Sequence, residues 1–416
     1  MAHVFHKKIL PALSLFLVLA LPLPLTAAAD DGSSALSGAS TTPSQILGMA
    51  IDGQAVPVDG TIDTTYPQID INAKSAILVD ASTGTVLYEK DADTELPPAS
   101  VTKVMTMLLV MEAVDDGRIS MDDMVTVSDF AASMGGSQVF LEPGEQMSVR
   151  DMLKAVAIAS GNDACVALAE FVAGSADAFV AKMNERAAEL GMTNTHFVNS
   201  NGLDADGHYS TARDIALMSR ELITKHPQIL QFTSTWMDSL RDGAFTLANT
   251  NKLIRFYRGA NGLKTGSTGN ALYCISAAAL RDGMQLIAVT MGSPSSDDRF
   301  TAAKKLLDYG FATYAVAHFA ADQLDPIAVA GGKQPTVPVH YGDVSILVRK
   351  GDVSKIEKQF TYADKPQAPI VAGQKLGTVD FSLGGQVVRS IDIIASESVD
   401  RLGWWDSVKR ILGYLF

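Results

Sequence analysis

The sequence has few cysteines and few basic residues for its length. Only two cysteines, Cys165 and Cys274, occur among 416 residues, too few for a disulfide scaffold or a cysteine-ligated zinc site. Between a disulfide and two buried free thiols, we favour the free thiols. Acidic residues outnumber basic ones by 46 to 33, and the formal net charge is −13. A general nucleic-acid-binding protein is disfavoured, because such proteins need a basic surface to displace counterions.

Two hydrolase signatures are also missing. The sequence has no Gly-x-Ser-x-Gly segment for a Ser-His-Asp hydrolase and no His-Glu-x-x-His segment for a metallopeptidase. His208 is the most suggestive histidine, but it lies in a loop rich in glycine and aspartate, where a structural role is favoured. The sequence therefore predicts neither a bound metal nor a cofactor.

The N-terminus predicts export. A positively charged start, an apolar run from Ile9 to Leu25 and the small residues Ala27–Ala29 are typical of a cleaved signal peptide over residues 1–29. An uncleaved membrane anchor is the alternative. Residues 30–67 are expected to form a flexible leader. We therefore expect the protein to act outside the cytoplasm.

The C-terminal segment, residues 397–416, predicts an amphipathic helix. Its apolar face contains Trp404, Trp405, Val408, Ile411, Leu412 and Leu415. The segment is too short to span a bilayer, but two adjacent tryptophans suit a helix that lies on a membrane surface. We therefore expect peripheral attachment to the outer face of the cytoplasmic membrane. A terminal helix packed on its own protein is the alternative.

The pattern between the two ends predicts two domains. In residues 68–317, strands at both ends enclose a helical block, which predicts an α+β domain whose sheet joins early and late segments. Strands are expected over Ser75–Val79, Thr85–Tyr88, Ala271–Ala278 and Gln285–Thr290, and helices over Val101–Val114, Arg150–Ala159, Asp163–Val172, Ala176–Leu190, Thr211–Thr224 and Arg299–Leu307. Residues 318–396 predict a small all-β domain, with strands over Val344–Val348, Pro369–Val371, Lys375–Phe381 and Gln386–Ile394.

The first of three short motifs is Ser100-Val101-Thr102-Lys103. Residues three apart share a helix face, so the side chains of Ser100 and Lys103 are expected to be neighbours. The helix that follows is apolar on almost every side and should run through the core. Burial would lower the pKa of Lys103, and a neutral amine can accept the proton of a serine hydroxyl. A lysine whose charge reaches solvent is the alternative for the motif alone.

The other two motifs are Ser-Gly-Asn and Lys-Thr-Gly. Ser160 and Asn162 flank a glycine between two predicted helices, where a tight turn can direct both side chains into one cleft. A helix cap is the alternative. Lys264 and Thr265, on an edge strand, can hold a carboxylate, while Gly266 lets a peptide backbone lie close. A solvated turn is the alternative.

Together and in this order, the three motifs resemble those of penicillin-binding proteins and class A β-lactamases. The surrounding stretches PPASVTKVMT, ASGNDACVALAE, NGLDADGHYSTARDIA and GLKTGSTG are similar to those of low-molecular-weight penicillin-binding proteins that act as D-alanyl-D-alanine carboxypeptidases. The resemblance covers about residues 68–416. It implies a penicillin-binding domain, with an antiparallel sheet and a helical subdomain, followed by a small β domain and an amphipathic tail.

The resemblance also implies a role for each motif residue. Ser100 would be the acylated nucleophile and Lys103 its general base. Ser160 and Asn162 would relay protons and position the substrate. Lys264 would keep Lys103 neutral through the proximity of two like charges.

The remaining implied roles concern substrate binding. Lys264 and Thr265 would bind the terminal carboxylate of the substrate, and the backbone N–H groups of Ser100 and Ser267 would form the oxyanion hole. Arg299, in the family's Arg-Phe pair, would help to hold the carboxylate.

The implied reaction is removal of the terminal D-alanine from peptidoglycan pentapeptides, with β-lactams as covalent inhibitors. A D,D-endopeptidase shares the motifs, although the β domain and tail favour the carboxypeptidase. A class A β-lactamase would need a glutamate for deacylation, and no Glu-x-x-Leu-Asn stretch lies between Asn162 and Lys264. A non-catalytic wall-binding scaffold is disfavoured because all key side chains are present.

Overall fold

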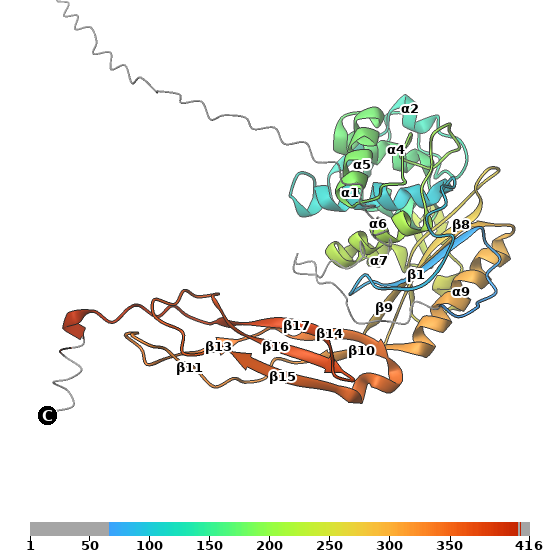
Figure 1. Cartoon of the computed structure of the whole chain (residues 1–416). Helices are drawn as coiled ribbons and strands as arrows, with labels where there is room; N and C mark the ends of the chain where they lie inside the picture. Colours follow the sequence, from blue (N-terminus) through green and yellow to red (C-terminus); the bar gives the residue numbers. More distant parts are fainter. Residues whose placement is uncertain (1–65, 407, 409–416) are drawn as a thin grey trace, which may run out of the picture. The chain divides into compact units, whose positions relative to one another are not determined.

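The computed structural model describes residues 66–406 and residue 408 (Figure 1). The predicted signal peptide over residues 1–29 lies outside the described residues, as do residues 30–65 of the predicted leader and residues 407 and 409–416 of the predicted last helix. The described chain contains an α+β domain and a C-terminal all-β domain. The fold class predicted from the sequence is therefore confirmed.

The α+β domain is built on a five-stranded sheet in the order β2-β1-β9-β8-β7, with antiparallel pairing throughout. The strands are β1 (Ser75–Asp80), β2 (Val86–Lys90), β7 (Ala260–Thr268), β8 (Leu272–Arg281) and β9 (Met284–Ser293). The first strands thus pair with the last, as the sequence predicted. β7 lies at one edge, so one side of its backbone is open to a ligand.

Side chains that alternate along the strands contribute to two hydrophobic cores, one on each face of the sheet. Ile77 and Val79 of β1 face the helical block, whereas Ala76 and Leu78 face α9 (Ser296–Thr313), because successive side chains of a strand point to opposite faces. Figure 1 shows α9 on one side of this sheet and the helical block on the other. The sheet is therefore buried on both faces.

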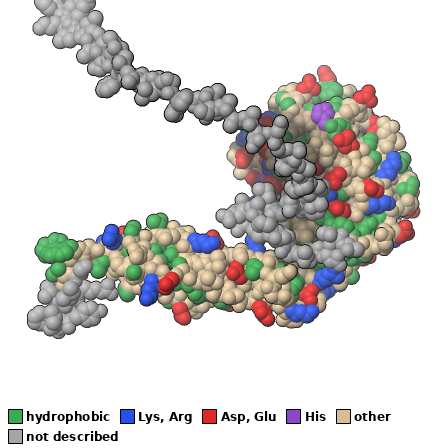
Figure 2. Space-filling model, viewed as in Figure 1, with side chains coloured by type: hydrophobic (Ala, Val, Ile, Leu, Met, Phe, Trp, Pro, Cys, Tyr) green, Lys and Arg blue, Asp and Glu red, His purple; other side chains and the backbone are tan. Residues whose placement is uncertain are grey.

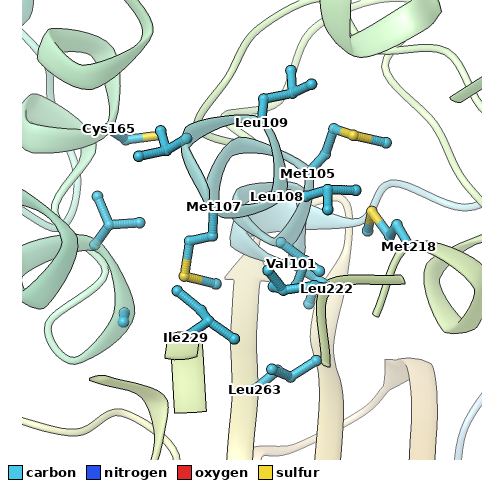
Figure 3. Packing of buried hydrophobic residues seen from close by; sticks show 14 of the residues in the cluster. Val101, Met105, Met107, Leu108, Leu109, Cys165, Met218, Leu222, Ile229 and Leu263 are labelled. Carbon is cyan, nitrogen blue, oxygen red and sulfur yellow. The ribbon is translucent and has the colours of Figure 1, made fainter. Parts of the chain in front are cut away.

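The helical block surrounds α1 (Lys103–Asp115), which begins after the 3₁₀ turn η2 (Ala99–Thr102). The other elements are α2 (Asp129–Ala132), α3 (Val149–Ala157), α4 (Asn162–Ala173), α5 (Ala176–Glu189), α6 (Ala212–Lys225), α7 (Leu230–Thr233) and α8 (Leu253–Phe256), with the hairpins β3 (Met124–Thr126)–β4 (Gln146–Ser148) and β5 (Met237–Leu240)–β6 (Phe245–Ala248). Figure 3 shows side chains of α1 directed to several sides, among them Met105, Met107 and Leu108. This helix is apolar all round because it is enclosed by α4, α6 and β7.

The C-terminal domain has its own hydrophobic core, which includes Val379, Phe381 and Ile393. Its strands are β10 (Tyr314–Phe319), β11 (Ile327–Ala328), β12 (Thr336–Val337), β13 (Val339–His340), β14 (Val344–Arg349), β15 (Ile356–Tyr362), β16 (Lys375–Leu383) and β17 (Gln386–Ala395). One sheet has the order β13-β17-β16-β15. The strand expected over Pro369–Val371 is wrong, because only Ile370 forms an isolated bridge there. The edge strand β15 was missed because it is half exposed and lacks a strong apolar pattern.

The described start of the last helix exposes both tryptophans. Trp404 and Trp405 are each 70% exposed, and their rings pack edge to face. Figure 2 shows hydrophobic side chains where Figure 1 draws this short red helix. Among the described residues, no single helix has the length and apolar composition of a membrane span; α4 and α5 meet both criteria only jointly, across an 82° bend.

Candidate active site

Ser100 and Lys103 lie side by side at the start of the central helix. Ser100 belongs to the 3₁₀ turn η2, in which residues i and i+3 lie almost directly above one another. The Nζ atom of Lys103 is 2.9 Å from the Oγ atom of Ser100. The neighbourhood predicted from the spacing is therefore present, and the tight turn produces it.

Lys103 is fully buried and holds three polar contacts. Besides Ser100, its Nζ donates to the Asn162 side-chain oxygen and to the Asn201 carbonyl, each at 2.6 Å. Burial lowers the pKa of Lys103 to about 8, against the smaller opposing effects of Cys165 and Asp163. The ammonium and amine forms are therefore both accessible near neutral pH.

Ser160 lies in the break between α3 and α4, and Asn162 is the first residue of α4. Ser160 is buried, and its backbone has the left-handed conformation, with a φ of 66°. This conformation turns the chain sharply before the helix begins at Asn162. The amide of Asn162 accepts from Lys103 and donates to the Gly135 carbonyl at 2.6 Å. Asn162 therefore links the lysine to the loop that contains Gly135.

Lys264 and Thr265 lie on the edge strand β7. Both are buried; the Lys264 Nζ donates to the Thr265 carbonyl at 2.8 Å, and the Thr265 hydroxyl donates to the Thr250 hydroxyl at 2.7 Å. Burial, followed by the charges of Lys103 and Arg299, holds the pKa of Lys264 well below its usual value. Repulsion between like charges is mutual, so each of these two buried lysines disfavours the charged form of the other.

Gly266 brings β7 against the turn that holds Ser100. A Cβ atom at Gly266 would lie 2.8 Å from the Ser100 backbone nitrogen and 2.9 Å from that of Val101, distances that a side chain does not tolerate. Only glycine therefore permits this approach. The next residue, Ser267, is exposed. The backbone of β7 and the N–H of Ser100 consequently lie together.

Arg299 lies behind this strand, on α9. Its guanidinium donates to the carbonyl of Gly266 at 3.0 Å and to that of Cys274 at 3.4 Å, and it packs against the rings of Tyr273 and Phe300. The residue is only 7% exposed. Its hydrogen-bond partners among the described residues are therefore mainly backbone carbonyls.

Three contributions to the site were not recognised in the sequence. The Asn201 carbonyl accepts from Lys103. Gly202 packs so closely on Ala99 that a Cβ atom would lie 1.9 Å from the Ala99 carbonyl oxygen. The buried Asp163 carboxylate accepts from the backbone N–H groups of Val139 and Leu141. Gly202, which stands in an Asn-Gly pair before the loop rich in aspartate and glycine, was the one of the three with a signal in the sequence. The Asn201 contact had none, because a backbone carbonyl is the same in every residue.

His208 and the cysteines have structural surroundings. The Nδ1 atom of His208 accepts from the Val198 N–H, and its Nε2 contacts the Thr102 hydroxyl at 2.9 Å. Burial lowers the pKa of His208 to about 4, so the ring is neutral near pH 7. Cys165 and Cys274 are buried and free, as predicted. Within residues 66–406, no three His, Cys, Asp or Glu side chains are grouped to hold a metal ion.

The fold and the Ser100–Lys103 pair are those of a serine hydrolase in which a buried lysine lies beside the hydroxyl. The pattern of the D-alanyl-D-alanine carboxypeptidase family, peptidase S11, matches residues 62–295, and that of the penicillin-binding protein 5 C-terminal domain matches residues 318–401. The chain belongs to the D-alanyl-D-alanine carboxypeptidase family. The resemblance inferred from the motifs is confirmed.

Individual relatives extend the match along most of the chain. D-alanyl-D-alanine carboxypeptidase DacF of Bacillus subtilis is 46% identical over 348 residues, or 82% of this chain and 89% of the relative. DacC of Escherichia coli is 36% identical over 372 residues, which is 85% of this chain and 91% of DacC. The crystal structure of penicillin-binding protein 5 from Haemophilus influenzae has a TM-score of 0.71 at 32% identity and covers 80% of this chain and 99% of its own. Penicillin-binding protein D2 of Listeria monocytogenes, solved in an ampicillin-bound form, has a TM-score of 0.55 at 36% identity. The match covers 59% of this chain and 100% of the Listeria chain.

Proposed function

We propose that this member of the family removes the terminal D-alanine from peptidoglycan pentapeptides through an acyl-enzyme on Ser100. The observation that carries the proposal is the 2.9 Å contact between the Ser100 hydroxyl and a fully buried Lys103 amine. Incubation of the mature protein with a pentapeptide should release one D-alanine per peptide. Release of no D-alanine would favour a wall-binding scaffold, and cleavage only of cross-linked peptides would favour an endopeptidase.

Acylation requires a neutral Lys103. Its amine takes the Ser100 proton while Oγ attacks the carbonyl carbon of the penultimate D-alanine. The N–H groups of Ser100 and Ser267 stabilise the oxyanion of the tetrahedral intermediate. Ser160 and Asn162 position the substrate and relay the proton to the leaving amine, and D-alanine departs. Water then attacks the ester carbonyl, and Ser100 recovers its proton.

The terminal carboxylate of the substrate binds at β7, beside Lys264 and Thr265. A carboxylate there favours the charged form of Lys264, since opposite charges attract strongly in a buried site. The resulting cation disfavours a second charge on Lys103 nearby. Substrate binding therefore promotes the neutral Lys103 that acylation needs.

Replacement of Lys264 by Gln is expected to raise the KM for a peptide ending in D-alanine by about 10- to 100-fold, the usual cost of a lost charged hydrogen bond. A matched peptide ending in D-alaninamide serves as the control, because it has no carboxylate. The two KM values are measured by D-alanine or D-alaninamide release. An equal rise for both peptides would contradict the carboxylate role.

β-Lactams are proposed to acylate Ser100 as substrate analogues. The ampicillin-bound Listeria relative supports this chemistry. The adduct should persist, because the chain lacks the Glu-x-x-Leu-Asn stretch whose glutamate activates the deacylating water in class A β-lactamases.

We further propose that the exported chain consists of a peptidase domain over residues 68–317, a β domain over residues 318–396 and a membrane-associating helix over residues 397–416. The family matches to residues 62–295 and 318–401 support the first two divisions. The strong exposure of Trp404 and Trp405 supports the third, since aromatic rings favour the membrane interface. The protein would then lie on the outer face of the cytoplasmic membrane, close to its peptidoglycan substrate.

A mature chain ending at Glu397 is expected to lose binding to lipid vesicles yet keep its carboxypeptidase activity on soluble peptide. Each large apolar side chain that enters the membrane contributes roughly 1.5–3 kcal/mol, so the loss of this face should abolish sedimentation with vesicles. Full-length mature protein with Trp404→Ser and Trp405→Ser is the matched control and should bind weakly. Equal sedimentation of the unsubstituted mature protein, the truncated chain and the Trp404→Ser, Trp405→Ser protein would show that the tail is not the attachment site.

A further inference from the structure

The guanidinium of Arg299 forms hydrogen bonds with backbone carbonyls next to the site. Its Nη1 atom donates to the Gly266 carbonyl at 3.0 Å and approaches the Cys274 carbonyl at 3.4 Å, while Nη2 lies 3.4 Å from the Ser296 hydroxyl. The rings of Tyr273 and Phe300 flank the group, at 5.4 and 4.8 Å from their centroids. Stacked rings and carbonyl acceptors hold a guanidinium in one place. Arg299 is therefore a fixed charge next to β7.

The Gly266 carbonyl belongs to the same peptide unit as the Ser267 N–H. Among the described residues, cis peptides occur only at Gly262–Leu263 and Ala368–Pro369, so this unit is trans. In a planar trans peptide the C=O and N–H bonds point in opposite directions. The N–H of Ser267 thus points away from Arg299, in a peptide unit that packs against the Ser100 backbone nitrogen.

A cation that donates to a peptide carbonyl also affects the N–H of that peptide. Withdrawal of electron density toward the carbonyl oxygen leaves the N–H more positive, and hydrogen bonds in such chains strengthen one another by about 10–30%. The same contact fixes the plane of the peptide, which matters because oxyanion donors act through their preset orientation.

We propose that Arg299 is a positioning residue for the oxyanion hole, which it orients and polarises through the Gly266–Ser267 peptide. This inference rests on the proposed role of the Ser267 N–H. It differs from the role implied by family resemblance, in which Arg299 holds the substrate carboxylate. The two roles can be separated, because the oxyanion forms only during the reaction, whereas the carboxylate is present from the start.

The test compares a D-Ala-D-Ala peptide with a peptidyl boronic acid in which boron replaces the scissile carbonyl carbon. The boronic acid has no terminal carboxylate, and its adduct with Ser100 places an oxygen in the oxyanion hole. Removal of a whole oxyanion donor costs about 10²–10³ in rate, so removal of its support should cost roughly 5- to 30-fold. For Arg299→Gln we expect this loss in kcat with little change in KM, and an equal rise in the inhibition constant of the boronic acid.

Lys252→Gln is the matched control, because this exposed residue also places a cation near the Phe300 ring, at 6.0 Å. Within the part of the chain that the structure describes, the Lys252 side chain forms no hydrogen bond or ion pair with β7. The kcat for the peptide and the inhibition constant of the boronic acid should both remain unchanged in Lys252→Gln. Arg299→Lys keeps the charge but not the planar fork, and it should recover part of the kcat. If Arg299→Gln does not fold, as judged by thermal unfolding, Arg299→Lys takes its place in the same comparison.

A raised KM with an unchanged inhibition constant for the boronic acid would overturn the proposal in favour of carboxylate binding. Equal losses in Lys252→Gln would overturn it in favour of a general effect of charge. Failure of the proposed function is distinguishable, because the wild-type protein itself would then release no D-alanine from the peptide.

Discussion

Replacement of Ser100 by Ala is expected to abolish penicillin labelling and to reduce D-alanine release by a factor on the order of 10⁶, as for other serine hydrolases that lose their nucleophile. The fold should survive. Among the described residues, the Ser100 hydroxyl accepts only from Lys103, which keeps its contacts with Asn162 and Asn201. The free energy of unfolding should therefore change by only about 1 kcal/mol.

Labelling is measured with a fluorescent penicillin and by the mass of the intact protein, and folding by thermal unfolding. Ser345→Ala, in strand β14 of the β domain, is the control and should label like the wild type. A folded Ser100→Ala protein that still acquires the mass of a penicillin would assign the nucleophile to another residue.

Lys103→Arg is expected to reduce acylation by about 10²–10⁴-fold, the usual contribution of a general base. A guanidinium keeps the positive charge but does not deprotonate near neutral pH. In the wild type, the pKa of Lys103 is lowered to about 8, so the amine is neutral above this pH and protonated below it. The acylation rate of the free enzyme should therefore rise with pH, with a midpoint near 8.

The measurement is the rate of β-lactam acylation as a function of pH. The rise of the acylation rate around pH 8, the limb of the pH profile, should vanish in Lys103→Arg. Lys154→Arg, a partly exposed lysine of α3 that pairs with Asp151 and Asp238, is the control and should retain the limb. The neutral amine would be ruled out as base if Lys103→Arg were acylated at the wild-type rate. It would also be ruled out if the acylation rate of the wild-type enzyme fell as the pH rises through 8.

Much of the framework could be predicted from the sequence because it depends on local patterns. The apolar helix after Ser100, the strands at both ends of the peptidase domain and the separate β domain all follow from periodicity and turn residues. The pairing of Ser100 with Lys103 is local too, since it needs only a spacing of three residues in a helical turn. The order of the three motifs was sufficient to predict the family.

Other features depend on contacts between distant segments. Packing of β7 against η2 brings Gly266 to the Ser100 backbone nitrogen, and the loop after Ser200 brings the Asn201 carbonyl to Lys103. Periodicity does not report such approaches, because the groups that meet are backbone atoms, which are the same in every residue.

The sequence by itself determined the fold class, the motif residues and the chemical class of the reaction. The tertiary structure decided how charge is arranged among them. Burial, which depends on all the surrounding elements, lowers the pKa of Lys103. The packing of α9 behind the sheet directs Arg299 onto the Gly266 carbonyl. The type of a charged residue can be read from a sequence, but its desolvation and its partners exist only once the chain has folded.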